Sequence, residues 1–304
     1  MKPTDANINH ELTIHSLQLI KPFLFSDVIA LSPIKSAFED STNHLWRVTL
    51  SSGKQAVLKV CGLSDVDDSD FWIGMEALFN VNYPLRMGEY AQVYTLLENN
   101  SDLAIPELLG CDSATKTSAG FIYCSNLTGH ALTSDAVNSD MVQQLAVHLA
   151  KLHQVQSPNF GALFNPQESA RTWWAMVTKT IELLADKKGV TLSNVDFENQ
   201  QACPKQFVPI MPDLRWDQFL SESNKLTGLV DLDAIVFGAV ELEFVLLEYL
   251  LTDTQAKLFK QSYSIYHSIP DLTHCRGLYR WLLFFMNVLG EKSSDAWMQA
   301  PKRF

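Results

Sequence analysis

Residues 212–233 read PDLRWDQFLSESNKLTGLVDLD, and this stretch decides the fold that we expect for the chain. The turn residues SESNK separate two short runs of apolar and polar residues, which predicts a β-hairpin. We expect a tight turn centred on Asn224 and Lys225, with the flanking residues paired symmetrically about it. A register slip of one residue would turn each side chain to the opposite face, so the pairing of the strands is open to this alternative.

Three polar side chains of this stretch are expected to meet at the open end of the hairpin. In the symmetric register Gln218 stands opposite Asp231, and Asp213 precedes them in an irregular loop that can fold back to the same place. Two oxygen ligands and a nearby carboxylate are the minimum for holding Mg²⁺ and orienting a hydroxyl nucleophile. Taken singly, each carboxylate also fits a surface turn. Asp233 competes for the second metal position, and Asp217 is expected to be solvated.

A lysine lies inside an apolar run further upstream, Lys59 in AVLKV. A buried ammonium group is costly unless it reaches a partner of opposite charge. We expect this partner to be Glu89, within the helical pattern of residues 86–98. A Lys–Glu pair of this kind positions the lysine on nucleotide phosphates. The alternative is a strand lysine that extends its ammonium group to solvent.

The apolar patterns divide the chain into two parts. HLWRVTL and QAVLKVC, joined by SSGK, predict a hairpin, and IPELLGCD and GFIYCSNL predict two more strands. From MVQQLAVHLAKLHQV onwards the patterns are mostly helical. We therefore expect an α+β fold with a small antiparallel-sheet lobe with one helix, residues 1–124, and a larger, mostly helical lobe, residues 125–304. The segment 62–85 is expected to be a plain surface insertion, with an added lid or an oligomer contact as the alternatives.

The composition excludes several classes of function. The 304 residues are 47% hydrophobic and carry a net charge of −11, so the chain can bury a core and lacks the basic excess of a nucleic-acid-binding surface. The five cysteines form no CxxC pair, which indicates a reducing compartment and no zinc or disulfide framework. The longest apolar run, around Arg280, is too short for a membrane span and predicts a buried helix. The N-terminal residues are too polar for a signal peptide, so we expect a cytoplasmic protein.

The ordered set of residues resembles the protein-kinase-like fold, and the local sequence is similar to the aminoglycoside phosphotransferase and related small-molecule kinase family. FIYCSNLTGHAL (121–132) is similar to that family's hinge, including its glycine, Gly129. QLAVHLAKLHQVQSPNFGAL (144–163) is similar to its helix ending in a Leu-His pair, followed by Phe-Gly. The resemblance covers most of the chain, from about Ser41 onwards. It also implies a structural role for Glu243, where the family often has an aspartate that supports the catalytic loop.

The resemblance implies a role for each residue of the hairpin region. Asp213 would orient or deprotonate the acceptor hydroxyl, and Gln218 and Asp231 would bind Mg²⁺. Two positions depart from the family pattern: Met211-Pro212 stands where the family commonly has His-Gly, and Gln218 stands where it commonly has Asn. The longer side chain of Gln keeps the carbonyl ligand but changes its position.

The resemblance also implies the nucleotide contacts. Lys59 would contact the α- and β-phosphates, with Glu89 orienting it, and the main chain near Ser125 and Leu127 would meet the adenine. The loop that would cover the phosphates, DSTN at 40–43, has no glycine, which is a further departure from the family.

These features predict a kinase that depends on ATP (or GTP) and Mg²⁺ and phosphorylates a hydroxyl of a small molecule. The acceptor would be aminoglycoside-like, choline-like or another metabolite, and the acidity of the chain is compatible with a cationic one. The alternative, motivated by the departures, is a catalytically silent protein that binds a nucleotide or ligand. A Mg²⁺-dependent hydrolase is a weaker third interpretation because it gives Lys59 and Glu89 no role. The oligomeric state stays open.

Overall fold

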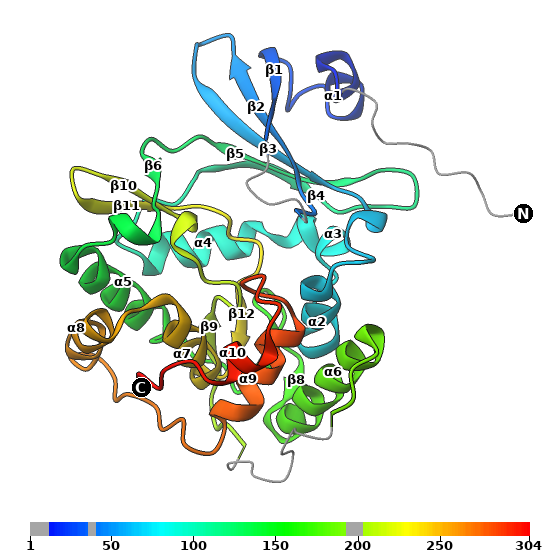
Figure 1. The fold of residues 1–304 in the computed structure, drawn as a ribbon. Coiled ribbons are helices and arrows are strands. Elements are labelled where there is room, and N and C mark those ends of the chain that lie inside the picture. Colours follow the sequence, from blue (N-terminus) through cyan, green and yellow to red (C-terminus); the bar gives the residue numbers. More distant parts are fainter. Residues whose placement is uncertain (1–11, 36–40, 193–202) are drawn as a thin grey trace, which may run out of the picture.

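The chain folds into two lobes, with a β-sheet in the upper lobe and mostly helices in the lower one (Figure 1). The computed structural model describes residues 12–35, 41–192 and 203–304. The expected two-lobed α+β architecture is confirmed.

Five antiparallel strands form the sheet of the small lobe, in the order β1-β2-β3-β5-β4. Their bounds are β1 Val28–Ile34, β2 His44–Leu50, β3 Gln55–Cys61, β4 Leu108–Asp112 and β5 Gly120–Ser125. The predicted hairpin is confirmed as β2 and β3. Its turn contains Gly53 at φ 81°, a conformation that glycine adopts without steric cost. Because β3 lies between β2 and β5, Lys59 stands in the interior of the sheet.

The helices before residue 125 differ from the single helix that the sequence predicted. Those in the described part are α1 Ile14–Ile20, α2 Asp70–Phe79, α3 Tyr83–Arg86 and α4 Ala91–Asn100. The helix expected over residues 86–98 begins only at Ala91, because Met87–Glu89 form a separate 3-10 helix. The amide of Gly88 donates to the hydroxyl of Ser113 (3.0 Å), which holds this turn against the end of β4.

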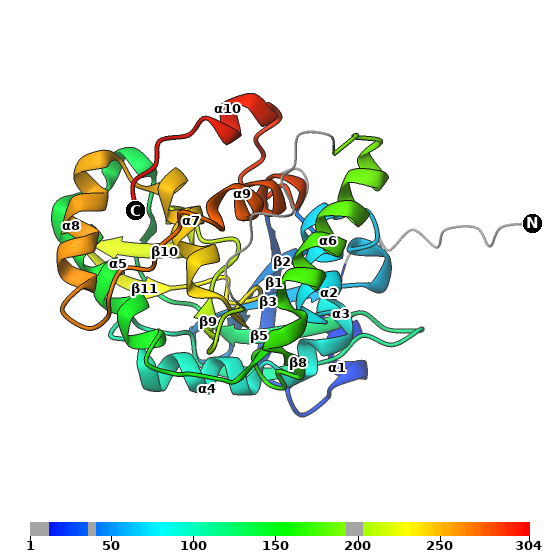
Figure 2. The same cartoon turned by 90° about the horizontal axis from the view of Figure 1, so that it is seen from below.

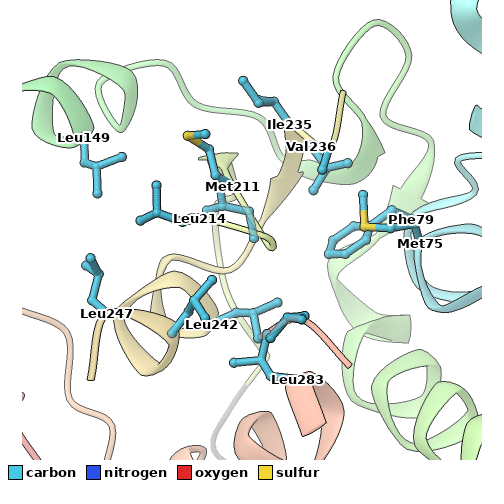
Figure 3. Close-up of a cluster of buried hydrophobic side chains, with 14 of the residues drawn as sticks. Met75, Phe79, Leu149, Met211, Leu214, Ile235, Val236, Leu242, Leu247 and Leu283 are labelled. Atoms are coloured by element: carbon cyan, nitrogen blue, oxygen red, sulfur yellow. The ribbon is translucent and has the colours of Figure 1, made fainter. Parts of the chain in front are cut away.

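The segment 62–85 belongs to the protein core, and the expectation of a surface insertion is wrong. Within it, α2 packs against α6 (Trp173–Lys188) of the large lobe. Met75 and Phe79 have no exposed surface, and Figure 3 shows them beside Val236. The sequence DFWIGMEALF is apolar on most of its circumference, as a helix buried between other elements requires.

Ion pairs add to the contact between α2 and α6. Asp70, in the first turn of α2, pairs with Lys187 (2.8 Å) and Lys188 (2.5 Å) in the last turn of α6. Both positions also suit the helix dipoles, since an acidic group stands at an N-terminus and basic groups stand at a C-terminus. In sequence α2 precedes residue 125, but the element with which it packs most extensively, α6, follows that residue.

The large lobe combines helices with two small sheets. Its remaining helices are α5 Ser139–Leu152, α7 Val240–Leu250, α8 Asp253–Tyr263, α9 Arg276–Phe285 and α10 Ser294–Met298. Its strands are β6 His130–Ala131, β7 Asn159–Ala162, β8 Glu168–Ser169, β9 Val208–Ile210, β10 Phe219–Glu222, β11 Lys225–Leu229 and β12 Val236–Gly238. The sheet orders are β11-β10-β6 and β8-β7-β12-β9. Besides Met87–Glu89, 3-10 helices lie after β3 at Leu63–Asp65 and in the large lobe at Ser134–Ala136, Ala170–Thr172 and Trp216–Gln218.

The helices of the large lobe surround the buried helices α7 and α9, with α5 and α8 on one side and α6 on the other (Figure 2). The amphipathic helix predicted from its leucine spacing is confirmed as α5. The buried helix predicted around Arg280 is α9, where the guanidinium pairs with the buried carboxylate of Glu248 (2.6 Å). No helix in the described ranges has both the length and the apolar character needed to cross a membrane.

The burial of α2 predicts a large effect of Phe79→Ala. This substitution should lower the free energy of unfolding by about 3–5 kcal/mol, because it leaves a cavity in the core. The matched control is Phe23→Ala, where the side chain is 97% exposed and the expected change is within about 0.5 kcal/mol. Urea unfolding of both variants tests the prediction. Equal changes in the free energy of unfolding would indicate that α2 is a surface insertion.

Candidate active site

The predicted hairpin forms as β10 and β11, but its register differs from the expected one. The turn residues are Ser223 and Asn224, both with positive φ (51° and 63°), as the favoured two-residue hairpin turns require. A bulge between Leu220 and Ser221 then moves the pairing back by one position. Gln218 therefore lies opposite Val230, whose backbone amide donates to the main-chain carbonyl of Gln218 (2.8 Å). The predicted pairing of Gln218 with Asp231 is wrong.

Gln218 nevertheless meets Asp213. Its Nε2 donates to Oδ2 of Asp213 (3.0 Å), and its Oε1 accepts from the amide of Arg215 (3.0 Å). Met211 and Leu214, on either side of Asp213, are fully buried in the core (Figure 3). The carboxyl group of Asp213 is thus held by packing on both sides and by a buried amide.

A buried network supports the loop from below. Oε1 of Glu243 on α7 accepts from the amide of Met211 (2.8 Å), and Oε2 lies 2.9 Å from Nε2 of His153. Nδ1 of His153 in turn lies 2.7 Å from the hydroxyl of Tyr263. Glu243 has no exposed surface, so its carboxylate depends on these partners. The structural role expected for Glu243 agrees with this geometry.

Lys59 reaches the same place from β3. Its Nζ donates to Oδ1 of Asp231 (2.5 Å) and to Oδ2 of Asp233 (3.0 Å). The expected ion pair between Lys59 and Glu89 is wrong, since the carboxylate of Glu89 pairs with Arg86 (2.7 Å). The cause is local: Glu89 lies in the 3-10 helix before α4, one short turn from Arg86.

Asp233 receives further hydrogen bonds that the sequence did not indicate. Its Oδ2 also accepts from the hydroxyl of Tyr83 (2.8 Å) and from Nδ2 of Asn43 (2.9 Å), and the hydroxyl of Tyr90 donates to its backbone carbonyl. Tyr83 is 150 positions away in the chain. A buried tyrosine is common in protein cores, so no local pattern marks these residues as partners of a carboxylate.

Burial and charge set the protonation of the site. Burial raises the pKa of Asp213 to about 7, and the negative charge of Asp231 adds to this rise. Burial likewise raises the pKa of Asp233. For Asp231 the effect of burial is outweighed by Lys59, which lowers the pKa. Burial also opposes the charge of Lys59, but the two carboxylates outweigh it and raise its pKa. Asp213, whose pKa is near neutral, therefore lies close to Asp231, which is ionised.

The residues expected at the hinge, Ser125 and Leu127, lie where the chain leaves the small-lobe sheet for the large lobe. Ser125 ends β5, and its amide and hydroxyl bond to the main chain of Glu107 (both 2.9 Å). Leu127 is partly buried against Gly228 of β11, where an added side chain would meet its Cδ1 at 2.9 Å. Asp40 of the expected phosphate-covering loop lies outside the described residues. The contacts of these residues with a nucleotide stay a prediction.

The site carries oxygen atoms of the types that bind Mg²⁺. The side chain of Asp231 is 39% exposed, and Oδ1 of Asp233 is a buried acceptor without a hydrogen-bond partner in the described chain. The amide oxygen of Gln218 retains a second lone pair beside its bond to Arg215. Carboxylate and amide oxygens are the ligands that Mg²⁺ prefers. In the described ranges no group of three or more His, Cys, Asp or Glu side chains is placed to hold a metal ion, so an ion here would need further ligands, such as phosphate oxygens.

A family model described as "Phosphotransferase enzyme family" matches residues 34–278, which is most of the chain. The chain belongs to this phosphotransferase family. The family implied by the sequence resemblance is thereby confirmed, and with it the expectation of an enzyme, a small-molecule kinase.

Solved structures with the same fold include three phosphotransferases. The GDP and kanamycin complex of APH(2")-IIia is 14% identical and covers 91% of this chain and 90% of its own, with a TM-score of 0.56. A thermostable mutant of aminoglycoside phosphotransferase APH(4)-Ia, in a ternary complex with ADP and hygromycin B, is 15% identical, with coverage of 91% and 89% and a TM-score of 0.59. Macrolide 2'-phosphotransferase MphH from Brachybacterium faecium is 13% identical, with coverage of 90% and 93% and a TM-score of 0.50. At sequence identities this low, the structural similarity shows only that the chain shares their fold. No curated protein matches the sequence.

The buried network predicts that Glu243→Ala destabilises the protein strongly. The substitution removes the acceptor of the Met211 amide and leaves His153 without its carboxylate, so we expect a loss of about 3–5 kcal/mol in the free energy of unfolding. The control Glu182→Ala, at an exposed position of α6, should change it by less than about 0.5 kcal/mol. Urea unfolding measures both, and a mild effect of Glu243→Ala would contradict the supporting role.

The raised pKa of Asp213 predicts a pH dependence of stability. The folded protein keeps a proton on this carboxyl group up to a pKa of about 7, whereas the unfolded chain releases it near pH 4. The stabilising contribution is therefore complete below about pH 4 and is lost as the pH rises towards about 7. Asp213→Asn cannot titrate, so it should gain stability relative to the unsubstituted protein across this window. Unfolding curves from acidic to neutral pH, without Mg²⁺, test this, and parallel curves would contradict it.

Proposed function

We propose that the protein transfers the γ-phosphoryl group of ATP or GTP to a hydroxyl of a small molecule, with Mg²⁺. The observation that supports this most strongly is that Lys59 of β3 meets Asp213 and Asp231, which flank the β10–β11 hairpin, at the junction of the lobes. Phosphoryl transfer depends on positioning and charge neutralisation more than on covalent chemistry by the protein, so a site of this kind is sufficient.

Each residue has a distinct task in this proposal. Asp213 orients the acceptor hydroxyl and accepts its proton as the oxygen attacks the γ-phosphorus and the bond to the β–γ bridging oxygen breaks. The pKa of about 7 suits this task, because a general base is most effective when its pKa is near the working pH. Lys59 neutralises charge on the α- and β-phosphates. Gln218 and Asp231 hold Mg²⁺, which supplies further neutralisation of phosphate charge when bound.

The adenine or guanine base would lie against the main chain near Ser125 and Leu127. The fold neighbours that bind GDP or ADP support a nucleotide site, and those with kanamycin or hygromycin B support a polar, hydroxyl-bearing acceptor. A cationic acceptor is the narrower proposal, supported by the net charge of −11. The absence of disulfides among the five cysteines supports a reducing, cytoplasmic location.

Calorimetric titration of ATP and GTP, with and without Mg²⁺, tests the nucleotide site. We expect binding that Mg²⁺ strengthens, and Asp231→Asn should abolish the Mg²⁺-dependent part because it removes a charged ligand. Asp140→Asn, at an exposed position in the first turn of α5, is the matched control and should bind as the unsubstituted protein does. No binding of either nucleotide would contradict the proposed function.

Transfer itself is tested by a screen of hydroxyl acceptors with and without amino groups. With any acceptor found, Asp213→Asn should lower the transfer rate by about 100-fold or more, because it removes the general base. Nucleotide binding without transfer to any acceptor would favour the catalytically silent alternative. Release of free phosphate alone would favour a hydrolase.

A further inference from the structure

The ammonium group of Lys59 is shared by two carboxylates in very different surroundings. The side chain of Asp231 is 39% exposed, whereas that of Asp233 is 5% exposed. A lysine ammonium has three donors, of which two are directed to these carboxylates. One donor remains for a phosphate oxygen, and contact with a second phosphate oxygen requires Lys59 to release one of the two carboxylates.

Asp233 is fixed in place far more firmly than Asp231. Its Oδ2 accepts from Tyr83 (2.8 Å) and Asn43 (2.9 Å) in addition to Lys59, and its main-chain carbonyl accepts from Tyr90. The ring of Tyr83 is itself held between two others: it stacks on Trp72 (4.4 Å between centroids, 11°) and meets Tyr90 edge to face (5.7 Å, 86°).

The two carboxylates would also respond differently to the loss of the lysine. A half-exposed carboxylate such as Asp231 can exchange one cation for another or for water at little cost. A buried carboxylate that loses its cation is left with an uncompensated charge, which is strongly unfavourable. Lys59 should therefore keep Asp233 and release Asp231 when a nucleotide binds.

We propose that Asp233, held by Tyr83 and Asn43, is the positioning residue for Lys59, in the place that Glu89 was expected to take. This inference rests on the proposed function, because it assigns the partner that keeps Lys59 directed at the phosphates. Asp231 is then free to act on Mg²⁺, and the two carboxylates divide their tasks. In this structure the carboxylate of Glu89 pairs with Arg86 (2.7 Å), whereas that of Asp233 contacts Lys59 directly (3.0 Å).

According to this proposal, Tyr83 affects nucleotide binding only by holding Asp233 in place. Tyr83→Phe removes the hydroxyl but keeps the ring that stacks on Trp72. We expect it to weaken ATP binding about fivefold, both with and without Mg²⁺, because it loosens the group that positions Lys59. The matched control is Tyr249→Phe, which removes a hydroxyl bonded to the carbonyl of Trp297 (2.9 Å) in the large lobe and should leave binding unchanged.

Calorimetric titration of ATP, with Mg²⁺ and with a chelator, measures these constants. Equal binding by Tyr83→Phe and Tyr249→Phe would overturn the proposal. A loss by Tyr83→Phe that appears only with Mg²⁺ would also overturn it, because Asp233 would then act on the metal. Absence of ATP and GTP binding by the unsubstituted protein would instead overturn the proposed function, and the nucleotide role of Asp233 with it.

The contact between Lys59 and Asp233 can also be tested by NMR in the absence of nucleotide. In protein labelled with ¹⁵N-lysine, a buried and hydrogen-bonded ammonium exchanges its protons slowly and gives a resolved signal, which Lys59→Arg identifies. We expect Asp233→Asn to abolish this signal and Glu89→Gln to retain it. Loss of the signal in Glu89→Gln alone would overturn the proposal. Should Asp233→Asn fail to fold, Asn43→Ala takes its place, with a weaker signal expected and an unchanged one contradicting the proposal.

Discussion

The buried ammonium group of Lys59 is the constraint on which the rest of the structure depends. It lies in an interior strand of the small-lobe sheet, where an unpaired charge would be strongly unfavourable, and both of its carboxylate partners come from the large lobe. The sheet must therefore stand over the segment that follows β11. Asp231 there adopts φ 61°, a conformation rare for residues other than glycine but tolerated by aspartate. Its place beside Lys59 is consistent with backbone strain held at a functional site.

The segment between β3 and α4 extends the contact between the lobes. Its helix α2 is buried against α6, and Tyr83, soon after α2, donates to Asp233. One stretch of chain thus packs into the large lobe and fixes the partner of the small-lobe lysine. The lobes are linked at the hinge, at the ion pairs of Lys59 and along α2. In this chain the aromatic residues of that stretch, rather than a helix glutamate, set the surroundings of the lysine.

The loop that carries Asp213 shows how the departures from the family pattern are accommodated. Met211 places its side chain in the core and its amide on Glu243, so packing and a buried carboxylate support the loop. Gln218 spans the distance between Asp213 and the amide of Arg215, using both ends of its carboxamide. The extra methylene of glutamine, relative to asparagine, is therefore used in a bridging contact within the loop.

The sequence by itself determined the elements and their order. Turn residues, alternating apolar positions and leucines at helical spacing are local signals, and they sufficed for β2 to β5, for the hairpin β10–β11, for α5 and for the two-lobed fold. The sequence proposed the candidate residues Asp213, Gln218 and Asp231 from their types and order, which do not depend on the register. Lys59 was found because a charge inside an apolar strand requires a partner, although the sequence could not say which one.

Only the tertiary structure decided the partners. The register of the hairpin depends on a bulge and on which two residues form the turn, and a difference of one position moved Gln218 from Asp231 to Val230. The expected partner of Lys59, Glu89, lies in the 3-10 helix before α4 and pairs there with Arg86. The tyrosines around Asp233 and the burial of α2 arise from packing between segments far apart in the chain. Such contacts leave no periodic trace in the sequence, because they are selected by shape and hydrogen bonding in three dimensions.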